Sequence, residues 1–300
     1  MLCEDLMFVV ASAGLNVPRA LIEHCRIKET PQQIVVDGML HDVRPETSFE
    51  TIDEWTRTAK VAPYPLGSSA PEYITLFNDL IKRTREVVVV TGTRKLLGSY
   101  DAAVAAIRVI TGTRKGFDVR VFDTGLVELG AGLIAAYCGA SARAGHGLAA
   151  VIEAGQTLAA ASMQLCVPHA GDALLASSRS DLVRSAVPGA GRLPIIGMQD
   201  GESRNLGMIA APHLIASALA ERLAERYATG SPVWVTVTYA TELSPARELL
   251  ALLRRRFDVR YALLRPFGPA GYLVLGAKAI GVSVHPVAAM KLVVNLPRAR

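Results

Sequence analysis

The sequence predicts an α/β protein of two domains, the first a parallel doubly wound sheet and the second a mixed sheet with helices. The chain has 300 residues, and a single hydrophobic core usually supports a smaller domain than that. In its first half, short apolar runs alternate with segments of helical periodicity, which is typical of parallel strands joined by helical crossovers. In its second half, Gly and Pro interrupt shorter runs. We therefore expect a boundary near residue 160, giving domains of residues 1–160 and 161–300.

Each element of the first half has a local signal. Pro18 stands in a first helical turn, Ser48 is a typical N-cap, and Asp37-Gly38 is a turn signal. The predicted strands are FVVAS from Phe8, QQIVVDG from Gln32, EVVVVTG from Glu86 and DVRVFDT from Asp118. The predicted helices are VPRALIEHC from Val17, SFETIDEWTRTA from Ser48, PEYITLFNDLIKRT from Pro71, GSYDAAVAAIRVI from Gly98, an Ala- and Gly-rich segment from about Leu126 to Cys138, and GHGLAAVIEAGQTLAAAS from Gly145. The prolines of AKVAPYPLGSSAPEY, from Ala59, predict a loop.

The second half has fewer regular signals. Alternation in PVWVTVTYA predicts a strand, and Leu spacing in SPARELLALLRRRF predicts a helix. Further predicted helices are DALLASSRSDLVRSA from Asp172 and PHLIASALAERLAERYA from Pro212. Further predicted strands are MQLCVP from Met163 and short runs within PGAGRLPIIGMQDGES from Pro188 and VRYALLRPFGPAGYLVLGAKAIGVSVHP from Val259.

Composition excludes several classes of protein. No apolar run reaches the roughly 18–20 residues of a membrane span, and the acidic N-terminus does not match a secretory signal, so we expect a cytoplasmic protein. The formal net charge is +5, and its densest run, Arg254–Arg256, is interpreted as a solvated helix end. No aromatic stripe accompanies that run, so nucleic acid is not an expected partner. The four cysteines are widely spaced and are expected to be buried.

The best candidate site follows the Val-rich run that begins at Glu86. A β-to-α loop lies at the carboxyl end of a parallel strand, where open α/β sheets bind ligands. Thr91, Thr93 and Arg94 offer hydroxyls and a guanidinium there for a small anion. There is no P-loop and no nucleophile elbow, and the histidines do not cluster. The loose G-x-G-x-x-A at Gly130 is interpreted as close helix packing, and Asp123 as a turn cap. These patterns predict a binding protein that uses no cofactor and is not an enzyme.

The order of these motifs resembles the DegV family of bacterial fatty-acid-binding proteins. That family carries a Thr-Ser-Gln-Pro-Ser-Pro stretch before a helix, then a strand and an Ile-Ser-Ser-x-Leu-Ser-Gly-Thr-Tyr loop, then a strand ending in Asp-Ser. LGSSAPEYITLF, TGTRKLLGSYDAA and VRVFDTGLVELGAGL stand in those places here, in the same order. The positions that match directly are Leu96, Gly98, Tyr100, Asp123, Gly130 and Gly132. The resemblance covers about residues 60–140.

The resemblance implies two α/β domains, the EDD fold, with a long-chain fatty acid held between them. The family's first loop serine falls on Thr93 and its second on Arg94. The family's threonine falls on Pro65 or Leu66, so a hydroxyl is lost that Ser68 or Ser69 can replace. The predicted ligand-binding residues are Ser12, Ser68, Ser69, Thr93, Arg94, Gly98, Ser99 and Arg179.

The resemblance also implies a fatty acid kinase as a partner. The residues in the second half of the sequence argue against this partner. The family's C-terminal His falls on Val274, and its Gly-Gly-Arg motif reads Ser177-Ser178-Arg179, keeping only the Arg. Two alternatives to lipid binding stay open. One is a divergent structural or regulatory protein on the same fold, whose lipid site has decayed. The other is an anion- or nucleotide-binding enzyme that uses the TGTRK loop.

Overall fold

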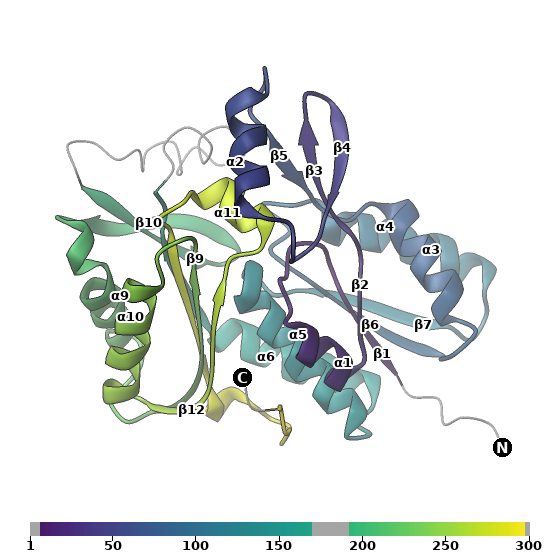
Figure 1. The fold of residues 1–300 in the computed structure, drawn as a ribbon. Helices are drawn as coiled ribbons and strands as arrows, with labels where there is room; N and C mark the ends of the chain where they lie inside the picture. The colour runs from purple at the N-terminus through teal and green to yellow at the C-terminus, as the bar shows by residue number, and fades with distance from the viewer. Residues whose placement is uncertain (1–6, 170–191, 298–300) are drawn as a thin grey trace. The chain divides into compact units, whose positions relative to one another are not determined.

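The computed structural model describes residues 7–169 and 192–297 (Figure 1). They form two compact units, and the chain passes between the units after Gln32, Pro65, Ala160 and Ala288. The described residues of unit 1 are 7–32, 66–160 and 289–297, and those of unit 2 are 33–65, 161–169 and 192–288. Domains of residues 1–160 and 161–300 stay a prediction, whereas each compact unit combines segments that are far apart in the sequence.

Unit 1 is built on a four-stranded sheet with the order β2-β1-β6-β7, and every pairing in it is parallel. Its strands are β1 (Phe8–Ala11), β2 (Ile27–Glu29), β6 (Glu86–Thr91) and β7 (Asp118–Asp123). Residues Val87 to Val90 of β6 have no solvent exposure. A strand covered on both faces is apolar at every position, which explains the unbroken valine run of the sequence.

Helices cover both faces of this sheet (Figure 1). They are α1 (Arg19–Cys25), α3 (Ala70–Leu80), α4 (Ser99–Thr113), α5 (Glu128–Arg143) and α6 (Leu148–Ala161). On one face, Tyr73 and Phe77 of α3 and Ala106 of α4 pack with Val10 and Val89 of the sheet. On the other face α5 packs against β1, β2 and β6. The first domain is therefore a parallel doubly wound sheet, as the sequence predicts.

Small residues let α5 approach its neighbours closely. A Cβ atom added to Gly132 would lie 2.3 Å from the carbonyl oxygen of Leu15, in the segment after β1. A Cβ atom at Gly139 would lie 2.9 Å from the carbonyl oxygen of Cys25. Neither backbone contact leaves room for a side chain. The G-x-G-x-x-A pattern at Gly130 is thus confirmed as helix packing.

The C-terminal segment returns to unit 1. The Tyr137 hydroxyl on α5 donates to the carbonyl of Leu292 at 3.2 Å and accepts from the Leu292 N–H at 2.9 Å. Lys291 pairs with Glu153 of α6 at 2.6 Å. These contacts hold residues 289–297 against the two helices on that face.

Unit 2 contains a six-stranded mixed sheet with the order β10-β9-β8-β13-β11-β12, in which only β11 and β12 are parallel. The strands are β8 (Met163–Val167), β9 (Leu193–Gln199), β10 (Glu202–Ile209), β11 (Pro232–Tyr239), β12 (Asp258–Pro266) and β13 (Ile280–Pro286). Helices α9 (Ile215–Ala224) and α10 (Leu243–Arg256) share a core with this sheet through Leu219, Leu223, Leu249 and Leu253. A short 3-10 turn, η1 (Pro212–Leu214), precedes α9, and η2 (Val287–Ala289) follows β13. The mixed sheet with helices is the second domain that the sequence predicts.

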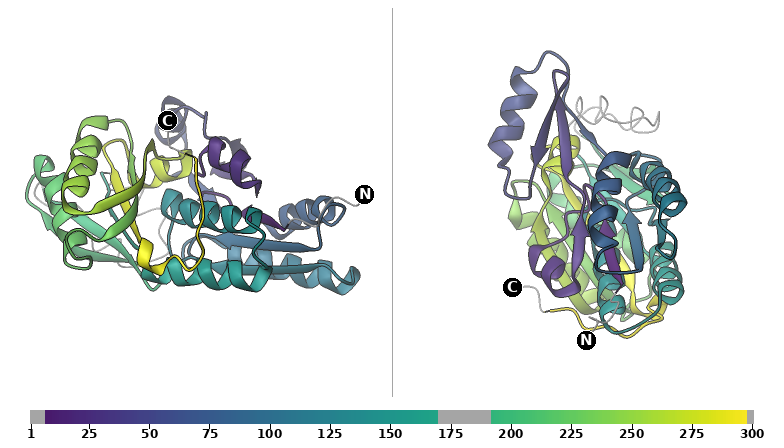
Figure 2. Two further views of the ribbon diagram at one scale, coloured as in Figure 1. Left: turned by 90° about the horizontal axis from the view of Figure 1, so that it is seen from below. Right: turned by 90° about the vertical axis from the view of Figure 1, so that its right-hand side faces the viewer.

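Residues 33–65 belong to unit 2, although the segments on either side of them belong to unit 1. They form most of a three-stranded sheet, ordered β4-β3-β5, and helix α2 beside it (Figure 1, Figure 2). Phe49 of α2 stacks on Tyr272 with ring centroids 3.9 Å apart, and the Tyr272 hydroxyl donates to the Asp53 carboxylate. These elements are α2 (Phe49–Thr58), β3 (Gln32–Val36), β4 (Met39–Val43), β5 (Tyr64–Leu66) and α11 (Pro269–Leu275).

The structure differs from the sequence-based prediction in three places. The second strand of the parallel sheet is β2, whose three residues are too few for an alternation signal, whereas QQIVVDG forms β3 of the other sheet. The predicted loop from Ala59 contains β5, because Pro65 is tolerated in an outer strand that lacks a neighbour on one side. In the stretch from Val259, where the sequence predicts short strands, Pro269 begins helix α11, because Pro is tolerated in the first turn of a helix. The predicted helix at residues 172–186 lies outside the described residues.

A buried hydrogen-bond network lies inside the mixed sheet. His285 has no solvent exposure, and its Nδ1 and Nε2 atoms lie 2.8 and 2.9 Å from the hydroxyls of Ser162 and Ser283. The Ser283 hydroxyl lies 2.5 Å from that of Thr236. Burial lowers the pKa of His285 to about 3, because the charged imidazolium would lose its hydration there. His285 is a satisfied core residue, as expected for an isolated histidine.

This network predicts acid sensitivity. As the pH falls below about 6.5, the unfolded chain binds a proton at His285 while the folded chain does not, so stability is full above that pH and is lost on the way down to about 3. The expected loss is about 2 kcal/mol at pH 5. Thermal unfolding at pH 7.5 and pH 5 should show a smaller difference for His285→Gln than for the wild type. Substitution of the exposed His213 by Gln is the control, and equal pH dependence in both variants would contradict the assignment.

Candidate functional site

The candidate site lies at the carboxyl edge of the parallel sheet in unit 1. From β1 the chain continues through α1 to β2 on one side, while from β6 it continues through α4 to β7 on the other. The neighbouring strands β1 and β6 therefore form the topological switch point of this sheet. Ligands of open α/β sheets bind beside the carboxyl ends of such strands. Ser12 directly follows β1, and Gly92 directly follows β6.

Three buried serines meet at this edge and accept hydrogen bonds from the backbone. The Ser12 hydroxyl accepts from the Gly92 N–H at 3.4 Å, and the Ser68 hydroxyl accepts from the Ala13 N–H at 2.9 Å. The Ser68 N–H in turn donates to the Ser99 hydroxyl at 2.9 Å. These bonds link the loop after β1, the turn before α3 and the first turn of α4.

Gly67 allows the turn before α3 to lie close to the start of α4. A Cβ atom on Gly67 would lie 2.6 Å from the Ser99 hydroxyl oxygen and 3.0 Å from the Ser99 nitrogen. Any other residue would push the turn before α3 away from the start of α4. Gly67 thus fixes the distance at which Ser68 and Ser99 meet.

Two further hydroxyls, which the sequence analysis missed, complete the cluster. The Thr30 hydroxyl lies 2.6 Å from the Ser68 hydroxyl. Tyr73 of α3 has no solvent exposure, and burial raises its pKa to about 12, a rise that the nearby hydroxyls of Ser68, Thr30 and Ser12 oppose. Thr30 follows β2, a strand too short to recognise, and Tyr73 matches an ordinary core position of its helix. We call Ser12, Thr30, Ser68, Tyr73 and Ser99 the hydroxyl cluster.

Two serine protons of the hydroxyl cluster have no acceptor among the described residues. When a hydroxyl oxygen accepts a backbone N–H, its own proton still needs an acceptor. Within the described part of the chain, the hydroxyls of Ser12 and Ser99 have no acceptor assigned to their protons. Gly98 stands at the N-cap of α4 with no side-chain cap, so backbone N–H groups and the positive end of the helix dipole lie beside Ser99. Such an arrangement favours a ligand that only accepts hydrogen bonds.

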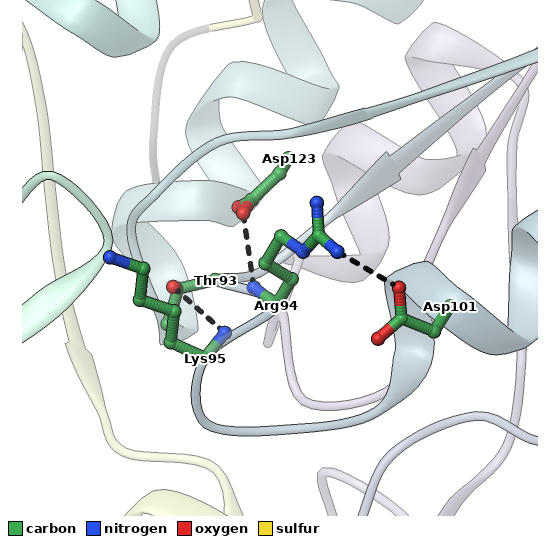
Figure 3. A network of polar contacts seen from close by, with 5 residues as sticks. All are labelled: Thr93, Arg94, Lys95, Asp101 and Asp123. Atoms are coloured by element: carbon green, nitrogen blue, oxygen red, sulfur yellow. Dashed lines mark hydrogen bonds and ion pairs between the residues drawn. The ribbon is translucent and has the colours of Figure 1, made fainter. Parts of the chain in front are cut away.

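The loop after β6 is held by its own turn contacts (Figure 3). The Asp123 carboxylate accepts from the Arg94 N–H at 3.1 Å and from the Gly125 N–H at 2.7 Å, so Asp123 caps turns, as expected. The buried Thr93 hydroxyl accepts from the Lys95 N–H at 3.4 Å. The Thr91 hydroxyl donates to the Phe122 carbonyl at 3.3 Å, which ties β6 to β7.

The Arg94 guanidinium lies on the exposed side of this loop. Its Nη2 atom is 3.3 Å from the Asp101 carboxylate on α4, and Figure 3 shows the side chain reaching toward that carboxylate. The guanidinium also lies over the Tyr100 ring, with 4.8 Å between its carbon and the ring centroid. Both side chains of the Arg94–Asp101 pair are more than half exposed. Such pairs contribute only about 0–1 kcal/mol.

The predicted site residues therefore fall into separate groups. The structure brings Ser12, Ser68, Gly98 and Ser99 together. Thr93 and Arg94 lie on the neighbouring loop. Ser69 is exposed and caps α3: its hydroxyl accepts from the Glu72 N–H at 3.4 Å, and the Glu72 carboxylate accepts from the Ser69 N–H at 2.6 Å. Arg179 lies outside the described residues.

Over residues 7–169 and 192–297, no three His, Cys, Asp or Glu side chains gather in a way that could hold a metal ion. None of the helices in those ranges is long and apolar enough to cross a membrane. Burial raises the thiol pKa of Cys25 to about 11 and that of Cys166 to about 12, which keeps both protonated at neutral pH.

Comparison with protein families decides the relationship that the motifs suggested. The model of the DegV family, described as uncharacterised proteins, matches residues 7–287. The chain belongs to the DegV family. No curated protein sequence matches the chain. The family match covers both units, so the departures in the second half are differences within the DegV family.

Solved structures of DegV proteins share the fold. A Thermotoga maritima protein described as revealing a fatty acid binding function aligns with a TM-score of 0.81 at 20% identity, over 93% of this chain and 98% of that one. A Eubacterium eligens protein loaded with heptadecanoic acid aligns with a TM-score of 0.81 at 17% identity, over 93% and 99%. DegV of Bacillus subtilis, described as a fatty acid binding protein, gives 0.78 at 17% identity over 93% and 99%. At such identities the likeness establishes the shared fold.

The capping role of Ser69 gives a direct prediction. Ser69→Ala should lower the free energy of unfolding by about 1 kcal/mol, because the first turn of α3 loses its cap, whereas Ser69→Asp should keep most of it. Urea or thermal unfolding measures both variants. Ligand binding should not change in either, and a specific loss of binding with unchanged stability would return Ser69 to the ligand site.

Proposed function

We propose that this protein binds a long-chain fatty acid, with the carboxylate at the carboxyl edge of the parallel sheet in unit 1 and the acyl tail buried. It would act as a lipid carrier or presenter in the cytoplasm rather than as an enzyme, and it would need no cofactor. DegV family membership and the fatty acids named for its structural neighbours support the ligand class. The two serine protons without an acceptor, those of Ser12 and Ser99, are the observation that carries the proposal.

A carboxylate suits these two unused protons. It has two oxygens with about four lone-pair sites and no proton to donate. The Ser12 and Ser99 protons can both point to it, and the uncapped N–H groups at Gly98 add donors beside a favourable helix dipole. An ester or an alcohol would use fewer of these donors. The polar edge is therefore expected to select the acid.

The tail and the head group contribute differently. Burial of an acyl chain contributes roughly 0.8 kcal/mol per methylene, so about ten methylenes give roughly 8 kcal/mol before entropic costs. Each hydrogen bond to a charged group adds about 1.5–3 kcal/mol. The tail thus supplies most of the affinity and the serines supply the preference for an acid. That the tail lies between the two units stays a prediction.

Arg94 and Thr93 complete the proposed head-group site. The exposed ion pair with Asp101 is weak, so the guanidinium can exchange Asp101 for a ligand carboxylate at little cost. Ser68 takes the place of the family threonine that falls on Pro65 or Leu66, but it acts through the buried cluster. Val274 stands where the family has His, which argues against a fatty acid kinase as a partner.

The ligand class is tested on protein purified from a bacterial host. Native mass spectrometry followed by organic extraction should find a fatty acid bound, or should find binding when palmitate is added to stripped protein. Protein that carries no lipid and ignores both palmitate and oleate would contradict the proposal. That result would favour the divergent structural or regulatory protein.

The head-group assignment is tested by Ser99→Ala. Loss of one hydrogen bond to the carboxylate should weaken palmitate binding roughly tenfold to hundredfold and leave methyl palmitate binding unchanged. Isothermal titration or competition with a fluorescent fatty acid measures both ligands. Ser69→Ala removes an exposed hydroxyl nearby and is the matched control. Equal losses for acid and ester in Ser99→Ala would remove Ser99 from the site.

A further inference from the structure

Within the hydroxyl cluster, the oxygen of the Tyr73 hydroxyl neither donates nor accepts a hydrogen bond among the described residues. That oxygen is also inaccessible to solvent. The other hydroxyls are nevertheless close, since those of Ser68, Thr30 and Ser12 act on its ionisation. A buried hydroxyl without a partner destabilises a protein, so a tyrosine is kept here at a cost that phenylalanine would avoid.

The surrounding packing does not require the hydroxyl. Tyr73 lies in an apolar cluster with Phe77 and Leu80 of α3 and Val10 of β1, and its ring stacks near that of Phe77 with 5.8 Å between centroids. A phenyl ring would make the same contacts. The Tyr73 hydroxyl therefore has its role in the hydroxyl cluster and not in core packing.

We propose that Tyr73 is a positioning residue for head-group binding, and that its hydroxyl joins the hydrogen-bond chain of Ser12, Ser68 and Thr30 when a carboxylate binds. The inference rests on the proposed function. The Ser12 and Ser68 oxygens accept backbone N–H groups, and the hydroxyls of Ser68 and Thr30 are hydrogen-bonded to each other. When a carboxylate accepts a hydrogen bond from the Ser12 hydroxyl, it fixes the rotation of that hydroxyl. A lone pair of the Ser12 oxygen then faces Tyr73.

The resulting chain runs in one direction. Thr30 donates to Ser68, Ser68 donates to Tyr73, Tyr73 donates to Ser12, and Ser12 donates to the carboxylate. Every proton in it has an acceptor, and no bond is made or broken. Hydroxyls linked in this way polarise one another, which strengthens the last bond, the one to the ligand. Thr30 and Tyr73 would thus act on the ligand without touching it.

The test compares Tyr73→Phe with Tyr137→Phe, which is the matched control in the same unit. Tyr137 is equally buried, but its hydroxyl both donates to and accepts from Leu292. Lipid-stripped protein is melted alone, with palmitate and with methyl palmitate. Without ligand, Tyr73→Phe should melt at or above the wild-type temperature and Tyr137→Phe below it. With palmitate, the rise in melting temperature should be smaller for Tyr73→Phe than for the wild type, and with methyl palmitate it should be unchanged.

The outcomes separate this inference from the function on which it rests. If the wild type binds palmitate and Tyr73→Phe keeps the full palmitate-induced shift, or melts lower without ligand as Tyr137→Phe does, Tyr73 is structural and the inference is overturned. If the wild type responds to neither ligand, the proposed function fails, and the inference with it. A reduced response to the acid alone, in a protein no less stable when free, supports the inference.

A second pair of variants keeps the test open if Tyr73→Phe does not fold. Thr30→Val removes the first hydroxyl of the chain at nearly constant volume, and Thr30→Ser restores it. Palmitate affinity should fall roughly threefold to tenfold in Thr30→Val and recover in Thr30→Ser, with methyl palmitate unaffected. Equal affinity for palmitate in the two variants would overturn the chain of hydrogen bonds.

Discussion

The parallel pairing of β1 with β6 is the constraint on which the candidate site depends. It aligns Phe8 with Val87 and Ala11 with Val90, so the next residues along each strand meet at one edge. The crossovers from these strands run to opposite sides of the sheet, and the loops after them diverge. Val87–Val90 have no solvent exposure, so β6, which sets this edge, lies inside unit 1 with both faces covered.

The hydroxyl cluster depends in turn on how closely two helix starts approach that edge. The absent side chain of Gly67 lets the turn before α3 lie against the start of α4, and the capping box of Ser69 and Glu72 fixes where α3 begins. Ser68 is thereby buried while its neighbour Ser69 is exposed. Adjacent serines thus have different roles: one belongs to a buried polar network and the other caps a helix.

Residues 33–65 pack in unit 2, and their local sequence pattern does not reveal this. Residues 33–65 have a turn, a hairpin and an amphipathic helix that would suit either unit. Their assignment follows from Ile34, Val43 and Ile52, which share a core with Tyr272 and Leu273 from the end of the chain. The stacking of Phe49 on Tyr272, together with the hydrogen bond to Asp53, reinforces that choice.

The sequence by itself determined the fold class, the parallel first sheet, the mixed second sheet and the family, because hydrophobic periodicity, caps and motif order are local properties. From the family pattern it also predicted Ser12, Ser68 and Ser99 as ligand-binding residues, and the structure brings these three serines together. Only the tertiary structure assigned Ser69 to a helix cap and Arg94 to Asp101, and only it added Thr30 and Tyr73 to the hydroxyl cluster. Hydrogen bonds between residues 31 to 80 positions apart leave no periodic trace, so the partners of a hydroxyl are decided by packing.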